Sequence, residues 1–133
     1  MTKAIRMFAT GGPEVMQYVD VELGRPGPGE VLVRQAACGL NFIDVYFRTG
    51  LYPQPLPAGL GQEGAGTVEA VGSDVVQFKA GDRVAYAGGP NGGYAEARLI
   101  PAAVSKPIES GSSTRLAAGI SRASAYPPFG PPA

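Results

Sequence analysis

The chain has 133 residues, of which 44% are hydrophobic, so it can form one domain with a real core and is too short for two domains of ordinary size. Its 11 basic residues balance its 11 acidic residues, so no overall field attracts it to nucleic acid or to an anionic membrane surface. The absence of histidine removes the commonest general base and the commonest zinc ligand, and a single cysteine excludes an internal disulfide.

The sequence shows no targeting or membrane segment. The first twelve residues, MTKAIRMFATGG, lack the apolar core of a signal peptide, and no run approaches the roughly 20 apolar residues that a bilayer span needs. We therefore expect a soluble, cytoplasmic protein without a membrane partner.

Short runs rich in Val, Ile, Tyr and Phe recur between Gly and Pro clusters, which is typical of a mainly β domain with frequent turns. The predicted strands span residues 3–9, 15–21, 30–37, 66–71, 83–87 and 94–99. The linkers GRPGPG and GGPNGG are predicted turns, because glycine supplies positive φ and proline presets the bend.

One segment, NFIDVYFR at residues 41–48, departs from the β pattern. Its apolar side chains at 42, 45 and 46 have the spacing of one helical face. Asn41 is a suitable N-cap, and Asp44 would lie at the third helical position, where a carboxylate suits the helix dipole. We expect one short helix of about two turns, held by tertiary packing.

The character of the chain changes after Val104. Residues 105–133 are dominated by Ser, Ala, Gly and Pro and show neither the helical nor the strand period. The sequence thus predicts a folded domain over residues 1–104 and a disordered tail over residues 105–133.

Gly59, Gly61 and Gly64 match the dinucleotide-binding pattern G-x-G-x-x-G. That pattern binds phosphate only where it leaves a strand and opens a helix. Here YPQPLPA precedes it and a strand-like run follows it, so we reject a dinucleotide-binding turn at this place.

The longest block with a family likeness is GQEGAGTVEAVGSDVVQFKAGDRVAYAG, residues 61–88. It resembles the zinc-independent, zeta-crystallin-like quinone oxidoreductase branch of the medium-chain dehydrogenase/reductase superfamily. Two further blocks, GGPEVMQYVDVE and ACGLNFIDVYFRTGLYP, resemble the same branch. The resemblance implies a GroES-like N-terminal domain, a distorted antiparallel β-barrel that forms one wall of an active-site cleft.

In the complete family a Rossmann domain forms the other wall of the cleft, and no segment of this chain resembles that domain. We therefore expect a truncated form that is inactive alone, and we do not expect the homodimer of the family. The glycines at 64, 66 and 72 and the turn Gly81-Asp82-Arg83 are interpreted as fold determinants that allow close backbone approach.

The zinc alcohol dehydrogenases of the superfamily place a cysteine and a histidine where this chain has Asn41 and Gln62. Amides do not compete with thiolate and imidazole for Zn²⁺, so we expect no metal. Without a Lewis acid the acceptor must take hydride readily, which favours a quinone. The resemblance accordingly implies an NADPH-dependent quinone reductase, with NADP(H) as its cofactor.

By resemblance, Tyr46 corresponds to the tyrosine that contacts the nicotinamide end of the cofactor, with Asn41 nearby in the cleft. Tyr46 could instead be a core aromatic residue, and Asn41 could serve only as the helix cap. Tyr52 could close over a substrate ring or simply pack in its loop. These three are the candidate catalytic residues, and Tyr46 and Asn41 are also the candidate cofactor contacts. Cys38 is expected to be a small buried hydrophobe rather than a nucleophile.

Two other functions stay open. A GroES-like fold alone also serves in ring-forming co-chaperonins, although the loops here offer no apolar anchor. The likeness to lens crystallins leaves a purely structural role as the third possibility.

Overall fold

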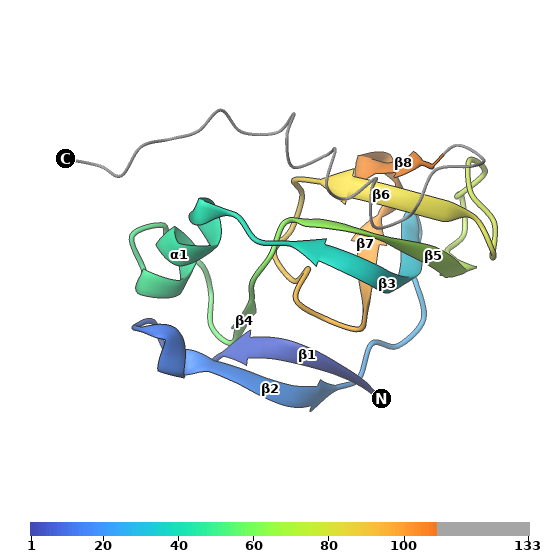
Figure 1. The fold of residues 1–133 in the computed structure, drawn as a ribbon. Helices are drawn as coiled ribbons and strands as arrows, with labels where there is room; N and C mark the ends of the chain where they lie inside the picture. Colours follow the sequence, from blue (N-terminus) through green and yellow to red (C-terminus); the bar gives the residue numbers. More distant parts are fainter. Residues whose placement is uncertain (109–133) are drawn as a thin grey trace.

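The computed structural model describes residues 1–108, and residues 109–133 lie outside the described part. In chain order the elements are β1 (Thr2–Met7), η1 (Pro13–Val15), β2 (Met16–Val21), β3 (Glu30–Gly39), α1 (Phe42–Thr49), β4 (Ala58–Gly59), β5 (Glu63–Val71), β6 (Arg83–Ala87), β7 (Ala97–Pro101), η2 (Ala102–Val104) and β8 (Ser105–Pro107). The expected mainly β fold with one short α-helix is confirmed for the described residues (Figure 1). None of these elements is a helix long and apolar enough to cross a bilayer.

The strands of the described residues form two antiparallel sheets. One has the order β2-β1-β4 and the other the order β7-β3-β5-β6-β8. The segment before β7 joins them, because Ile5 donates its N–H to the Tyr94 carbonyl at 2.8 Å while Gln35 donates its N–H to the Glu96 carbonyl at 2.8 Å. The two sheets therefore share one hydrogen-bonded frame.

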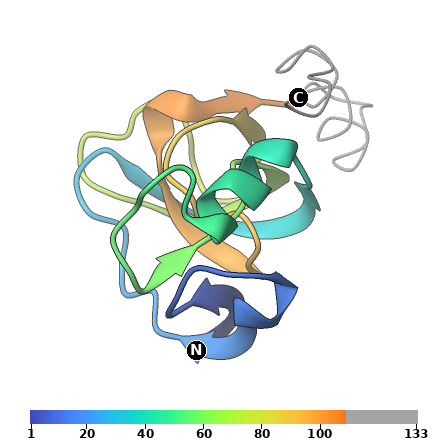
Figure 2. The ribbon, with the colours of Figure 1, turned by 90° about the vertical axis from the view of Figure 1, so that its left-hand side faces the viewer.

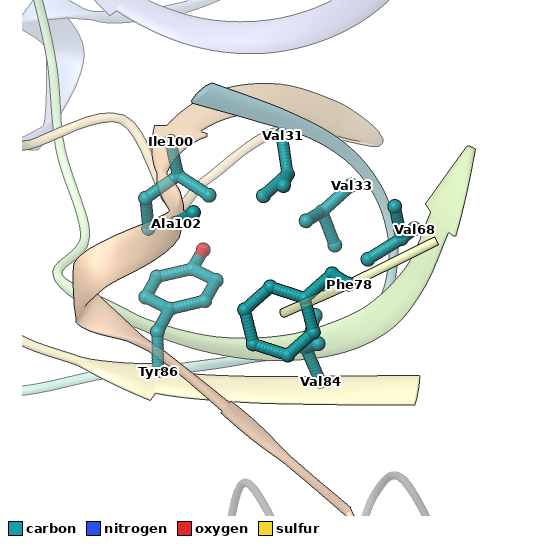
Figure 3. Packing of buried hydrophobic residues seen from close by; sticks show 8 residues of the cluster. All are labelled: Val31, Val33, Val68, Phe78, Val84, Tyr86, Ile100 and Ala102. Atoms are coloured by element: carbon teal, nitrogen blue, oxygen red, sulfur yellow. The ribbon is translucent and has the colours of Figure 1, made fainter. Parts of the chain in front are cut away.

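The main core lies within the five-stranded sheet, which curves around it (Figure 3). Its buried members are Val31, Val33, Val68, Phe78, Val84, Tyr86, Ile100 and Ala102. A second, smaller cluster of Met7, Ala58 and Leu60 lies at the three-stranded sheet, and Phe47 of α1 packs against it. This second cluster is what attaches the helix to the sheets.

Three glycines confirm the interpretation of the 61–88 block as a fold determinant. A Cβ on Gly66 would overlap the Arg34 carbonyl of the neighbouring strand, and one on Gly72 would overlap the Gly27 carbonyl. A Cβ on Gly64 would lie 2.6 Å from the Tyr86 hydroxyl oxygen. At Gly66 and Gly72 the backbone of another segment comes too close for any side chain, whereas at Gly64 a side chain would displace the Tyr86 hydroxyl.

The strand predictions are right in kind and differ at the ends. β5 begins at Glu63 rather than at residue 66, and β7 runs from Ala97 to Pro101 rather than over 94–99. The two-residue strand β4 was not predicted. β8 lies inside the segment predicted as a tail, and it pairs with β6, so regular structure extends to Pro107. The rest of that predicted tail, 109–133, lies outside the described residues.

The helix is confirmed, but its apolar stripe does not face the core. Phe42 is 63% exposed and Val45 is also exposed, whereas Asp44 is only 4% exposed. The buried side of α1 carries Asp44 and the partly buried Phe47. The spacing at 42, 45 and 46 thus predicted the helix correctly and leaves an apolar face open to solvent.

The prediction that Gly59, Gly61 and Gly64 do not form a dinucleotide-binding turn is confirmed. Gly59 lies in β4, and Gly64 lies within β5, so the three glycines connect two strands and open no helix. No phosphate-binding helix N-terminus is formed there.

Candidate functional site

Helix α1 lies at one end of the molecule, on the side that faces the viewer in Figure 2. Its exposed face presents a group of aromatic rings. The Tyr46 ring lies 5.3 Å from that of Tyr52 in an edge-on arrangement and 6.3 Å from that of Phe42, measured between centroids. Tyr52 is 44% exposed and Tyr46 is half-buried, so the group is accessible from solvent and supported from below.

The loop that follows the helix places Tyr52. Gly50 ends α1 in the left-handed conformation, with φ of 86°, and the chain then turns back so that the Tyr52 N–H donates to the Tyr46 carbonyl at 3.1 Å. The Tyr52 ring also contacts Phe47 edge-on, at 5.7 Å between centroids. Phe47 in turn packs against the smaller core cluster, so the aromatic face is connected to the interior.

The start of the helix is held by a buried carboxylate. Asp44 accepts the backbone N–H of Asn41 at 3.0 Å, which is half of a capping box, and the same oxygen accepts the Tyr94 hydroxyl at 2.6 Å. Burial, and next the bond to Asp44, raise the pKa of Tyr94, so that its hydroxyl stays protonated as a donor. The predicted N-cap position of Asn41 and the predicted place of Asp44 at the third helical residue are confirmed.

Asn41 also faces a second buried carboxylate. Its side-chain Nδ2 donates to Glu63 at 3.0 Å, and Glu63 is 2% exposed. The other Glu63 oxygen is buried without a hydrogen-bond partner. The Asn41 amide is therefore oriented from behind by β5, which fixes which way the side chain is presented.

Behind these groups lies a polar layer between the sheets. The Tyr86 hydroxyl donates to the Gln35 side-chain oxygen, and the Gln35 amide donates to the carbonyls of Gly93 and Ala95, each at 2.7 Å. Burial raises the pKa of Tyr86, which the positive charge of Arg98 opposes. This layer holds the loop before β7 in place against β3.

The structure brings two of the three candidate residues together. Tyr46 and Tyr52 are in ring contact, while Asn41 lies at the start of the same helix and is turned toward Glu63. The backbone carbonyl of Gln62, the second amide in the position of a zinc ligand, accepts the Gly88 N–H at 2.8 Å.

Cys38 is exposed rather than buried, which corrects the expectation of a buried residue. It lies near the end of β3, where partial desolvation and then the charge of Asp44 raise the pKa of its thiol. The thiol is thus accessible but less readily ionised, which agrees with the expectation that Cys38 is no nucleophile.

Sequence reasoning did not find Tyr94, Tyr86 or Arg98. Each comes from a different strand or loop. The fold brings Tyr94 to Asp44 of the helix, whereas Tyr86 and Arg98 contact each other in the polar layer behind it. The sequence does carry one weak signal, since Glu63 is a charged residue directly before a glycine-rich apolar run.

Comparison with known proteins shows which family this chain resembles. The alcohol dehydrogenase GroES-like domain family matches residues 27–110. Quinone oxidoreductase of Pseudomonas aeruginosa is 61% identical over 101 residues, which are 75% of this chain and 31% of that protein. Quinone oxidoreductase 1 of Escherichia coli is 46% identical over 114 residues, covering 79% of this chain and 35% of that protein.

Solved structures agree with this likeness. A quinone oxidoreductase from Pseudomonas syringae superposes with a TM-score of 0.86 at 55% identity, over 89% of this chain and 37% of the other. The Escherichia coli quinone oxidoreductase complexed with NADPH superposes with a TM-score of 0.85 at 44% identity, over 87% and 36%. The chain spans about a third of the length of the curated relatives it matches.

Proposed function

The chain belongs to the alcohol dehydrogenase GroES-like domain family, in the quinone oxidoreductase branch of the medium-chain dehydrogenase/reductase superfamily, and on this premise we propose that it forms the substrate side of an NADPH-dependent quinone reductase that uses no zinc. In this proposal, Asn41, Tyr46 and Tyr52 line the cleft.

The observation that carries the proposal is the exposed aromatic face of α1. Planar rings prefer to pack against other rings in offset or edge-on contact, and Tyr46 with its two neighbours offers such a surface beside polar groups. A quinone, or the nicotinamide ring of NADPH, is a planar ring with carbonyl acceptors. The phenol groups of Tyr46 and Tyr52 are suitable donors for those acceptors.

The residues present fit the nicotinamide end of the cofactor. Tyr46 would support the ring, and Asn41, held by Glu63, would present its amide to the polar edge. When bound, NADPH supplies the hydride. The chain's own part is to orient the two rings, to exclude water with its aromatic side chains, and to donate hydrogen bonds toward oxygens that gain charge.

The donor atoms at two positions support the proposed absence of zinc. Asn41 uses its amide nitrogen as a hydrogen-bond donor to Glu63, and an amide at 41 and another at 62 are poor replacements for thiolate and imidazole. A reduction without a Lewis acid needs an electrophile that is reactive by itself, which supports a quinone as the acceptor.

We also propose that the 133-residue chain has no turnover alone. Within residues 1–108, no glycine-rich turn opens a helix that could hold the cofactor's pyrophosphate. In relatives that span about three times this length, those contacts would come from other parts of the protein.

Ring binding to α1 can be tested on the chain itself. A water-soluble quinone is titrated while tyrosine fluorescence is followed, and Tyr46→Leu is compared with Tyr18→Leu, an exposed tyrosine on β2. We expect Tyr46→Leu to weaken binding by roughly tenfold, the size of an aromatic contact plus a lost hydrogen bond. Equal affinities in the two variants would contradict the assignment of the site to α1.

A further inference from the structure

A second polar feature lies apart from the residues of the proposed cleft. It is a cavity of about 240 Å³ between β1, β2 and β7. It is much larger than a single water, whose share of the liquid is about 30 Å³. Its lining includes two arginines, Arg6 and Arg98, with Gly59 and Gly92 between them. No residue of α1 lines this cavity.

Arg98 is a buried cation without a counter-charge. It is 5% exposed, and among the described residues it forms no ion pair with a carboxylate. Its Nη2 donates to the Pro90 carbonyl at 2.7 Å, its Nη1 reaches the Tyr86 hydroxyl at 3.4 Å, and its Nε is buried without a partner. A guanidinium removed from water in this way favours an anion beside it.

Arg6 brings a second positive charge to the same place. A Cβ on Gly59 would lie 2.8 Å from the Gly92 Cα and 3.8 Å from the Arg6 Nη1, and one on Gly92 would lie 3.6 Å from the Arg98 Nη2. Both guanidinium groups therefore border the same pair of glycines. Arg6 is half-buried and forms no ion pair within the described part of the chain.

The other residues that line the cavity indicate which class of ligand it fits. Ala4, Ile5, Val21 and Leu99 supply apolar surface, and the acidic residue of the lining, Glu22, is exposed and paired with neither arginine. A carboxylate head fits the fork of a guanidinium, and a short aliphatic chain fits the apolar wall.

We propose that this cavity is a binding site for a small aliphatic carboxylate, held by Arg98 and Arg6. It is independent of the proposed quinone reduction, because it shares no residue with Asn41, Tyr46 and Tyr52.

The test uses the full chain and butyrate as the probe, with butyramide as the uncharged probe of the same shape. Binding is measured at constant ionic strength by calorimetry and by proton–nitrogen correlation spectra. We expect saturable butyrate binding that shifts the amide signals of Gly59 and Gly92, and no saturable binding of butyramide. Butyramide binding as tightly as butyrate, or inorganic phosphate binding more tightly, would overturn the proposal.

Two variants locate the charge. Arg6→Gln is expected to weaken butyrate binding by about tenfold, equivalent to ~1.4 kcal/mol, and Arg98→Met to abolish it. Arg25→Gln, an exposed arginine outside the cavity, is the matched control and should change the affinity by less than about twofold.

If Arg98→Met does not fold once the Tyr86 contact is lost, the decision rests on Arg6→Gln, which removes a half-buried group. Equal affinities in Arg6→Gln and Arg25→Gln, or wild-type affinity in a folded Arg98→Met, would refute the site.

Discussion

Tyr94 and Asp44 join the loop before β7 to the first turn of α1. The hydroxyl of Tyr94 and the backbone N–H of Asn41 converge on one oxygen of Asp44, which is nearly fully buried. A shared acceptor of this kind couples its donors, so removing one of them should change what the others contribute.

A double-mutant cycle tests this coupling. Tyr94→Phe and Asp44→Asn should each lower the free energy of unfolding by about 1–3 kcal/mol, since each leaves a buried polar group without its partner. The double variant should cost less than the sum by at least ~0.5 kcal/mol. Urea denaturation of the four proteins gives the values, and strict additivity would contradict the shared acceptor.

The thiol of Cys38 is accessible, and the pKa of this thiol is raised above its ordinary value of 9.0 by desolvation and then by the charge of Asp44. Alkylation by iodoacetamide proceeds through the thiolate. The rate should therefore still be rising with pH at 9, and Asp44→Asn should move the profile to lower pH. Asp20→Asn, an exposed carboxylate on β2, is the control and should leave the profile unchanged. A profile centred below 9.0 would contradict the account.

At the residue scale, the sequence predicts mainly those roles that depend on residues close together in the chain. Asn41 and Asp44 were predicted because capping depends on residues three apart. The roles of Tyr94 and Arg98 were not predicted, because they depend on which strands lie side by side. The expected burial of Cys38 was wrong because it lies at an exposed position near the end of β3.

In α1 the spacing of apolar residues predicted the helix correctly but did not predict which side of it is buried. The residues at 42, 45 and 46 have helical spacing, but the structure buries Asp44 and packs Phe47 on the smaller core cluster. The polar partners of Asp44 explain this choice, because a capped and hydrogen-bonded carboxylate can be buried while an aromatic face stays exposed. An apolar period alone does not distinguish a core face from a binding face.

Gly66 tests the interpretation of the glycine-rich block at the level of a strand pair. A methyl group there would overlap the Arg34 carbonyl of β3, so Gly66→Ala should lower the free energy of unfolding by roughly 2–4 kcal/mol. Gly27→Ala is the control, because its Cβ would meet only the end of the Glu30 side chain, at 3.3 Å. Thermal or urea unfolding measures both. If Gly66→Ala lowers the free energy of unfolding no more than Gly27→Ala does, the two strands can move apart at this position without cost, which would contradict the interpretation.

The strands themselves were predicted where a run of β-branched residues is long enough to be recognised. β4 has two residues, and β8 has three and ends in proline, so neither carries a pattern of its own. The first residues of β5 are Glu-Gly-Ala-Gly, which have low strand propensity and are held in the sheet by pairing on both sides. Tertiary contacts, rather than propensity, define these ends.

At the scale of the whole fold, the described residues 1–108 form two sheets joined by a bridging segment, with α1 at one end (Figures 1 and 2). The exposed side of α1 carries the aromatic rings. The family was recognisable from sequence because the blocks that carry it, such as residues 61–88, are also the ones that fix close strand packing. The cavity lined by Arg6 and Arg98 had no such signal, because the two arginines are separated by most of the domain in sequence.

The central claim is that the α1 face of this chain is the substrate side of a zinc-free, NADPH-dependent quinone reductase. The most direct test places residues 1–104 of this chain in the Escherichia coli quinone oxidoreductase that was solved with NADPH, in place of its matching segment. NADPH-dependent reduction of a quinone is then measured with and without a metal chelator, with Tyr46→Leu as the site variant and Tyr18→Leu as its control. We expect chelator-resistant turnover that Tyr46→Leu lowers by roughly tenfold or more and Tyr18→Leu leaves within about twofold. A folded chimera without turnover, or with turnover that does not depend on Tyr46, would contradict the claim.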